Sequence, residues 1–176
     1  MVAWMDVYAN LKCIKGISGP NKGIAFKSDQ VRGMNVEEKR VLFLGDSITQ
    51  AGQYVGFVEY ALRKKSPQKI YDFYSLGLDS ETVSGLSEHD HPFPRPNVHE
   101  RLSRALSEIK PDLIFICYGI NDGIYHPLNE DILDAFRSGY LSLIEKCQAT
   151  GAELVVITPP TFQAYAIPEK VRPLGA

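Results

Sequence analysis

The chain has 176 residues, of which 44% are hydrophobic, so it can bury one sizeable core, and its length favours a single folded domain. The formal net charge of -2 and the pI near 6.1 come from interspersed charges without a basic stripe, which argues against a nucleic-acid partner. The longest apolar runs are strand-sized, so we expect no membrane span, no secretory leader and a cytoplasmic protein.

Cysteine and histidine spacing gives no metal-site signature. Cys117 and Cys147 lie inside apolar runs, where a free cysteine packs as a small core residue. His89 and His91 flank a single residue, but no third ligand accompanies them. We therefore expect neither a metal nor another cofactor.

Residues 1–39 form the first segment and carry four Gly and Pro residues in close succession, at positions 16, 19, 20 and 23. Only short stretches of this segment resemble strands. We interpret it as an N-terminal extension of uncertain order, preceding a domain at residues 40–176.

The next segment shows the first strand and helix of an alternating pattern. An apolar run at residues 41–44 predicts a buried strand that ends at Gly45, and helical spacing of apolar residues predicts a helix at 52–65. Residues 70–76 are more mixed, as expected for a strand nearer the sheet edge, and end at Gly77.

The pattern then repeats after a long polar loop at residues 79–97, a length that usually marks a site or an interface. Apolar spacing predicts a helix at 98–109 and an apolar run predicts a strand at 113–118. Asn129 is placed to cap another helix, and residues 154–157 predict a fourth strand. Alternating strands and helices indicate a parallel α/β domain.

The residues just after each strand are the first candidates for a site, because ligands of open parallel sheets bind outside the carboxyl ends of the strands. Gly45-Asp46-Ser47 follows the first strand and places a hydroxyl on a strand-to-helix turn near free backbone N–H groups. Ser47 is therefore a candidate nucleophile. The alternative is a serine that only caps the helix.

Two further turns carry groups that can stabilise an oxyanion. Asn121, after the third strand, offers a side-chain amide, and Gly77, after the second, offers a backbone N–H without an obstructing Cβ. Asn-Asp-Gly is also ordinary turn composition, and Gly77 can equally be a strand terminator.

These three motifs occur in this order at the ends of successive strands, and in this combination residues 40–160 resemble the GDSL/SGNH hydrolase superfamily. The resemblance implies a three-layer α/β/α, flavodoxin-like fold with a parallel sheet of order 2-1-3-4-5. It implies that Ser47 attacks an ester carbonyl while the Ser47 N–H, the Gly77 N–H and the Asn121 amide stabilise the oxyanion. The supporting residues would be Asp46 and Asp122.

The stretches 80–88, 94–96 and 117–127 further resemble a bacterial subgroup of carbohydrate esterases. Such enzymes commonly remove acetyl groups from sugars, which implies an acylated carbohydrate as the small-molecule substrate. The alternative is that each of these loop residues is a solvated or structural one. The loop residues that would shape a sugar site are His89, His91, Arg95, Tyr125 and His126.

The family's base, a histidine in an Asp-x-x-His segment, has no match after Pro160. The tail is also too short for a fifth strand and a terminal helix, so we expect a domain cut short, with sheet order 2-1-3-4. His126 is the least implausible replacement base. Without an imidazole, we expect a feeble esterase.

The absence of a fifth strand would leave the apolar edge at residues 154–157 uncovered. We expect the N-terminal extension, another copy of the chain in a homo-oligomer, or residues of a longer protein to cover it. The alternative function is a non-catalytic carbohydrate-binding or interaction module. A mononucleotide-binding protein is disfavoured, because residues 16–22 do not complete a phosphate-binding loop.

Overall fold

A computed structural model describes residues 37–124, 126 and 129–160. Most of the predicted N-terminal extension, Tyr125 and residues 161–176 lie outside these ranges. The described residues belong to one compact unit that begins at Val36.

Four parallel strands form the sheet, in the order β2-β1-β3-β4. The first strand is longer than its apolar run predicted, because the polar residues before position 41 also pair with β2. The order agrees with the expected α/β fold. The strands are β1 (Glu38–Gly45), β2 (Ile70–Gly77), β3 (Leu113–Cys117) and β4 (Glu153–Ile157).

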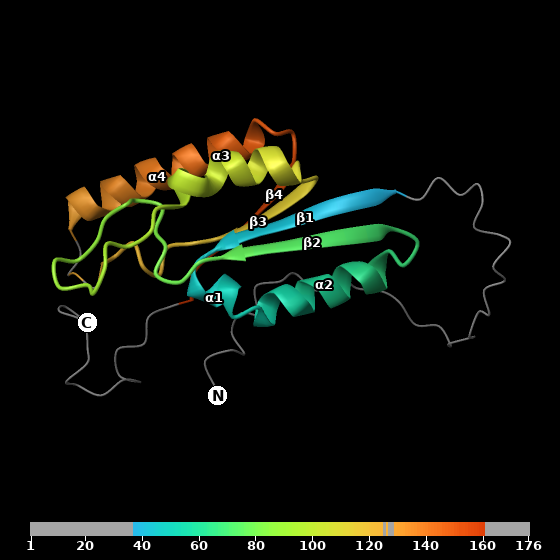
Figure 1. The fold of residues 1–176 in the computed structure, drawn as a ribbon, viewed down its shortest axis with the longest axis horizontal. Helices are drawn as coiled ribbons and strands as arrows, with labels where there is room; N and C mark the ends of the chain where they lie inside the picture. Colours follow the sequence, from blue (N-terminus) through green and yellow to red (C-terminus); the bar gives the residue numbers. More distant parts are fainter. Residues whose placement is uncertain (1–36, 125, 127–128, 161–176) are drawn as a thin grey trace, which may run out of the picture. The chain divides into compact units, whose positions relative to one another are not determined.

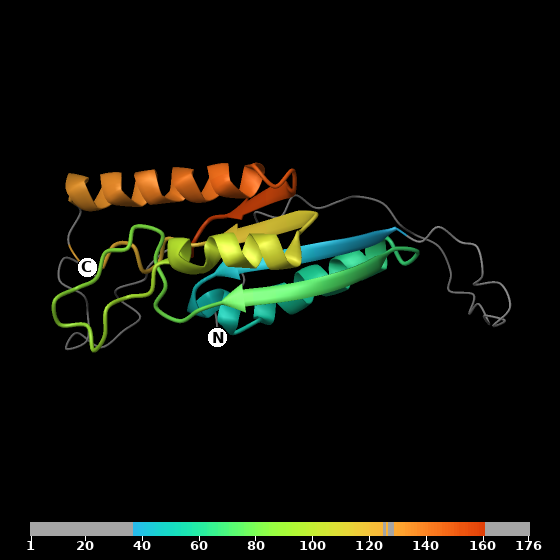
Figure 2. The ribbon, with the colours of Figure 1, turned by 45° about the horizontal axis from the view of Figure 1, so that its top comes forward.

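Helices cover both faces of the sheet and complete three layers. In Figure 1, α3 and α4 lie over one face and α1 and α2 over the other, and the same separation is visible in the turned view of Figure 2. No helix in the described ranges is long and apolar enough to cross a membrane. The helices are α1 (Ser47–Gln50), α2 (Gln53–Lys65), α3 (Val98–Ile109) and α4 (Glu130–Gln148).

Strand β1 is buried on both faces and supplies two separate cores. Leu42 and Leu44 pack into the cluster that includes α3 and α4, where Cys147 is fully buried as predicted. Phe43 points to the opposite face, where its ring stacks on that of Phe115 with centroids 4.8 Å apart. Successive side chains of a strand face opposite ways, so a continuous apolar run satisfies both cores.

Asparagine caps begin the two long helices over one face. The Asn129 side chain accepts hydrogen bonds from Asp131 N (2.8 Å) and Ile132 N (3.2 Å), which confirms the predicted cap of α4. Asn97 caps α3 in the same way through His99 N. Each cap stabilises its helix by about 1 kcal/mol.

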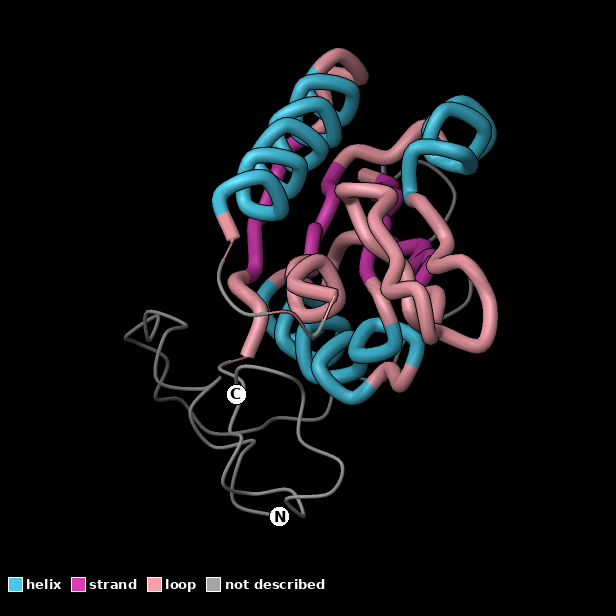
Figure 3. Tube along the Cα trace, turned by 90° about the vertical axis from the view of Figure 1, so that its left-hand side faces the viewer, coloured by secondary structure: helices cyan, strands magenta, loops and turns pink. Residues whose placement is uncertain are grey.

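Strand register brings the segments after β1, β2 and β3 to the same level. Gly45, the last residue of β1, lies opposite Gly77 of β2 on one side and Cys117 of β3 on the other. Figure 3 looks onto these carboxyl ends, where loops gather above the strands. The candidate site residues follow these three ends.

Candidate active site

Ser47 is the first residue of α1 and is half-buried directly after β1. The residue that caps this helix is Asp46, whose carboxylate accepts from Ile48 N at 2.9 Å. The interpretation of Ser47 as a mere helix cap is therefore wrong, because its neighbour performs that function. The Ser47 hydroxyl remains at the turn as a candidate nucleophile.

The Asp46 carboxyl is 1% exposed, and burial raises its pKa to about 6. The N–H of Ile48 opposes this rise, while the charges of Asp122 and Glu81 add to it. Two further acidic side chains thus act electrostatically on Asp46, the residue directly before Ser47.

Glycines at the ends of β1 and β2 allow α1 to pack against the sheet. A Cβ on Gly45 would lie 1.8 Å from Thr49 Oγ1, and one on Gly77 would lie 2.0 Å from the backbone nitrogen of Gln50. Both distances are far below van der Waals contact. Any side chain at either position would therefore push α1, and Ser47 with it, away from the strands.

The role of the Gly77 N–H as an oxyanion donor stays a prediction, and the neighbouring backbone shows how this N–H is oriented relative to β1. Leu78 N donates to Gly45 O at 3.0 Å, so the N–H of Leu78 faces β1. Successive residues of a strand direct their N–H groups to opposite sides, so the Gly77 N–H faces away from β1. The described geometry gives this glycine a role in close packing against α1.

Asn121 and Asp122 lie in the tight turn after β3, and both are buried. Asn121 Nδ2 donates to the main-chain oxygen of Glu81 at 3.1 Å, which occupies one of the two amide hydrogens. Asp122 Oδ1 accepts from Val83 N (2.9 Å) and Ser84 N (2.8 Å). This turn is thereby joined to the segment that follows β2.

Glu81 and the half-buried Arg101 form an ion pair that the sequence interpretation missed. The Glu81 side chain is fully buried, and Arg101 Nε donates to its Oε1 at 2.6 Å while Nη2 donates to Oε2. Tyr118 OH donates to the same carboxylate. The partners are 20 residues apart, so no local motif links them; only the unusual placement of a glutamate between small residues hints at burial.

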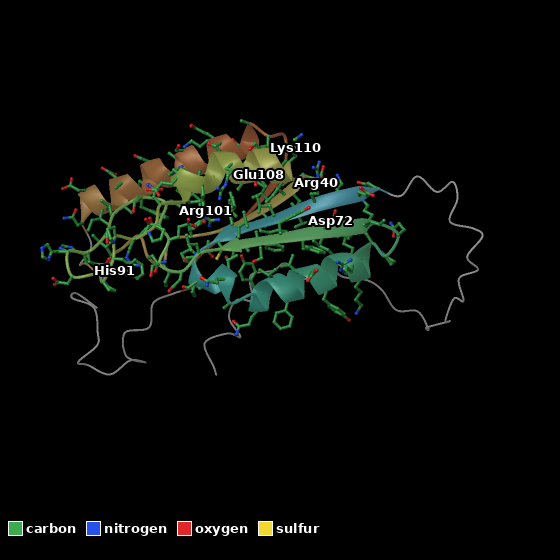
Figure 4. All side chains as sticks on the ribbon, viewed as in Figure 1. Arg40, Asp72, His91, Arg101, Glu108 and Lys110 are labelled. Carbon is green, nitrogen blue, oxygen red and sulfur yellow. The ribbon has the colours of Figure 1, made fainter. Side chains whose placement is uncertain are left out.

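The described hydrogen bonds of the predicted sugar-site residues in the long loop run to other loop residues and not to Ser47. His89 pairs with Asp90 in full solvent exposure, and His91 contacts Phe93 O near the outer end of the loop (Figure 4). Arg95 is only 6% exposed and binds both carboxylate oxygens of Glu88. Arg95 therefore holds the loop together, as the structural alternative expected.

The identity of a base for Ser47 remains a prediction. The described hydrogen bonds of His99 run to Gly139 O and Lys146, far along the chain from the serine turn. His126 is exposed after the Asn121 turn, while Tyr125 and residues 161–176 lie outside the described ranges. No group of three or more potential ligands for a metal ion occurs within those ranges.

Comparison with solved structures gives the same fold in acetyl xylan esterases. The chain superposes with a TM-score of 0.54 and 23% identity on a catalytic mutant of Axe2, an acetylxylan esterase from Geobacillus stearothermophilus, covering 72% of this chain and 62% of that one. Axe2 itself superposes with a TM-score of 0.53 and 22% identity, covering 70% of this chain and 61% of that one. The acetyl xylan esterase AlAXEase superposes with a TM-score of 0.50 and 23% identity, covering 66% of this chain and 56% of that one.

The chain thus spans about 56–62% of the length of these structures. Curated protein sequences give no match. A family match covers residues 43–174, three quarters of the chain, and includes all three strand-end motifs. The chain belongs to the GDSL-like lipase/acylhydrolase family.

Proposed function

We propose that this protein is an ester hydrolase that uses Ser47 to remove acetyl or other short acyl groups from a carbohydrate. The observation that carries the proposal is the position of Ser47 at the first residue of α1, two residues after Gly45, which lies in register with the ends of β2 and β3. Asp46 caps this helix, so the Ser47 side chain is not needed as the cap. The carbohydrate substrate rests on the resemblance in fold to acetyl xylan esterases.

The proposed reaction forms an acyl-enzyme at Ser47. The hydroxyl oxygen attacks the ester carbonyl, the alcohol departs, and water then hydrolyses the acyl group from the serine. The Ser47 N–H belongs to the first turn of α1, where N–H groups have no acceptor within the helix, and it supplies one oxyanion donor. The second hydrogen of the Asn121 amide supplies another.

Charge near the site has to be neutralised for this reaction to proceed. A developing oxyanion is disfavoured by nearby carboxylates, and Asp46, Glu81 and Asp122 are all buried here. Arg101 neutralises Glu81, and two backbone N–H groups bind Asp122. Burial nevertheless raises the pKa of both Asp46 and Asp122, and Asp122 Oδ2 has no hydrogen-bond partner among the described residues.

Hydrolysis of p-nitrophenyl acetate and of an acetylated xylo-oligosaccharide tests the proposal. A fluorophosphonate probe followed by peptide mass spectrometry identifies the labelled residue, and Ser47→Ala is the matched control. We expect Ser47 to be labelled and acetate to be released from both substrates. Activity should be low if no imidazole approaches Ser47, because the hydroxyl then stays protonated at neutral pH.

The alternative, a non-catalytic carbohydrate-binding module, gives a different result in the same experiment. Acetylated xylo-oligosaccharide would bind in calorimetry, acetate release would stay at background, and Ser47 would not react with the probe. That combination would replace the esterase proposal.

Asn121→Ala addresses the proposed oxyanion donor. Removing one donor of this kind costs on the order of a hundredfold in kcat. The control is Asn129→Ala, which removes a helix cap outside the site and should leave kcat unchanged. Equal turnover by Asn121→Ala and the wild type would exclude the amide from the reaction.

A further inference from the structure

We propose that the ion pair between the buried Glu81 and the half-buried Arg101 is the positioning element of the candidate oxyanion site, because it fixes the carbonyl that orients the Asn121 amide. The inference rests on the proposed function for its kinetic consequence. Its structural content, that Arg101 controls the Asn121 side chain, can be tested without any activity.

The first step is the link between the ion pair and Asn121. The Asn121 amide donates to the main-chain oxygen of Glu81. The carboxylate of the same glutamate accepts hydrogen bonds from Nε and Nη2 of Arg101. A bidentate arginine–carboxylate pair fixes angle as well as distance. By fixing the Glu81 side chain, Arg101 therefore also restricts the Glu81 backbone.

The second step is that the Glu81–Thr82 peptide is bound on both sides. Its carbonyl accepts from Asn121 Nδ2, while its N–H, that of Thr82, donates to Pro96 O at 2.9 Å. The planar peptide links these two bonds rigidly. Rotation of the carbonyl away from Asn121 would break the bond to Pro96 as well.

The third step is that Arg101 also anchors the end of β2. Its Nη2 donates to Leu76 O at 2.7 Å, one residue before Gly77 and the contact with α1. Figure 4 places Arg101 between α3 and the carboxyl ends of the strands. One guanidinium thus joins α3, the end of β2 and the segment that holds Asn121.

An arginine is required for this arrangement. Its planar group directs several donors at fixed angles, whereas a lysine presents one compact charge that cannot bind two carboxylate oxygens and a carbonyl with the same geometry. Arg101→Lys keeps the positive charge near Glu81 but loosens the glutamate backbone. The Asn121 amide should then sample more than one orientation.

Nuclear magnetic resonance of the Asn121 side-chain amide provides the direct test. The resonances are assigned by their loss in Asn121→Asp. In Arg101→Lys we expect them to shift and their hydrogens to exchange with water about tenfold faster. Glu81→Gln/Arg101→Gln replaces the charges by two amides and should have the same effect without leaving an isolated buried charge.

Arg63→Lys is the matched control. Arg63 also extends from a helix, donates to a β2 carbonyl, that of Tyr71, and pairs with a glutamate, Glu59. It lies at the opposite end of the strand, so the Asn121 resonances should not change. An unchanged Asn121 amide in folded Arg101→Lys or in the folded double variant overturns the inference.

The kinetic constants kcat and KM then distinguish a loss of Asn121 orientation from a general loss of folded structure. Loss of orientation should lower kcat for acetyl ester about tenfold or more while KM stays within about twofold, because the misplaced donor acts on the transition state. If the wild-type protein shows no hydrolysis and no labelling of Ser47, the proposed function fails. The resonance test still confirms or overturns the role of Arg101 in that case.

Discussion

Two regions of the molecule depart in opposite ways from the rule that apolar groups are buried and polar groups exposed. At the carboxyl ends of β1, β2 and β3, charged side chains are buried, with Glu81 0% and Asp122 2% exposed. Along β4 and the facing side of α4, apolar side chains are exposed, including Leu141 at 61% and Val156 at 49%.

The two departures have different physical accounts. Buried charge is costly unless it is paired, and the polar region compensates most of its charge internally through Arg101 and backbone N–H groups, while Asp122 Oδ2 is buried without a hydrogen bond from any described residue. The apolar region forms a groove between α4 and the end of β4, lined by Phe136, Tyr140 and Val156 among others, and no segment within the described ranges covers it. The comparison separates a polar region of buried, largely paired charges from an apolar region that no described segment covers.

The largest expected effect is the loss of activity in Ser47→Ala. Removing the nucleophile should reduce hydrolysis of p-nitrophenyl acetate to background, because no acyl-enzyme can form. Leu141→Ala, in the apolar region, should leave turnover unchanged. Full hydrolysis by the purified Ser47→Ala protein would contradict the serine mechanism.

The next effect is on stability and comes from breaking the ion pair on one side. Arg101→Met leaves Glu81 buried without its charged partner and should lower the free energy of unfolding by about 3 kcal/mol. Changing both residues to methionine should recover much of that loss, since no buried charge remains. Urea unfolding of the three proteins measures the difference, and a single variant as stable as the wild type would show that Glu81 needs no partner.

A smaller effect depends on pH and concerns Asp46. Burial raises its pKa from 3.8 to about 6, so the folded protein holds a proton that the unfolded chain has lost. Its contribution to stability is therefore full below about pH 4, falls as pH rises to about 6 and stays low above that. Asp46→Asn keeps a capping oxygen but no charge.

The free energy of unfolding of Asp46→Asn relative to the wild type should accordingly rise by about 1–3 kcal/mol between pH 4 and pH 7. Denaturant unfolding at four pH values across this window measures it. A constant difference between the two proteins would indicate that the Asp46 carboxyl titrates normally when folded.

The smallest effect is expected in the apolar region. Val156→Thr should change the free energy of unfolding by no more than about 0.5 kcal/mol, because the side chain is half-exposed. The measurement also sharpens the comparison: a loss several times larger would mean that β4 is covered in solution. Dependence of that loss on protein concentration would identify the cover as a second copy of the chain.

Much of the fold could be predicted because its signals are local. Apolar runs and helical spacing located every long element, and Asn129 correctly predicted the start of α4. The resemblance to the hydrolase family supplied the sheet order, which periodicity alone does not determine. The expectations for a fifth strand, a base and the N-terminal extension concern residues outside the described ranges and stay predictions.

The sequence by itself determined where Ser47 and Asn121 fall, because residues after strands necessarily collect at one edge of a parallel sheet. The tertiary structure alone decided which neighbours act on them. It made Asp46 the helix cap, gave Gly77 a packing contact with α1, and paired Glu81 with Arg101 across 20 residues. The partner of a buried charge depends on where the chain returns in space, and no local pattern records that.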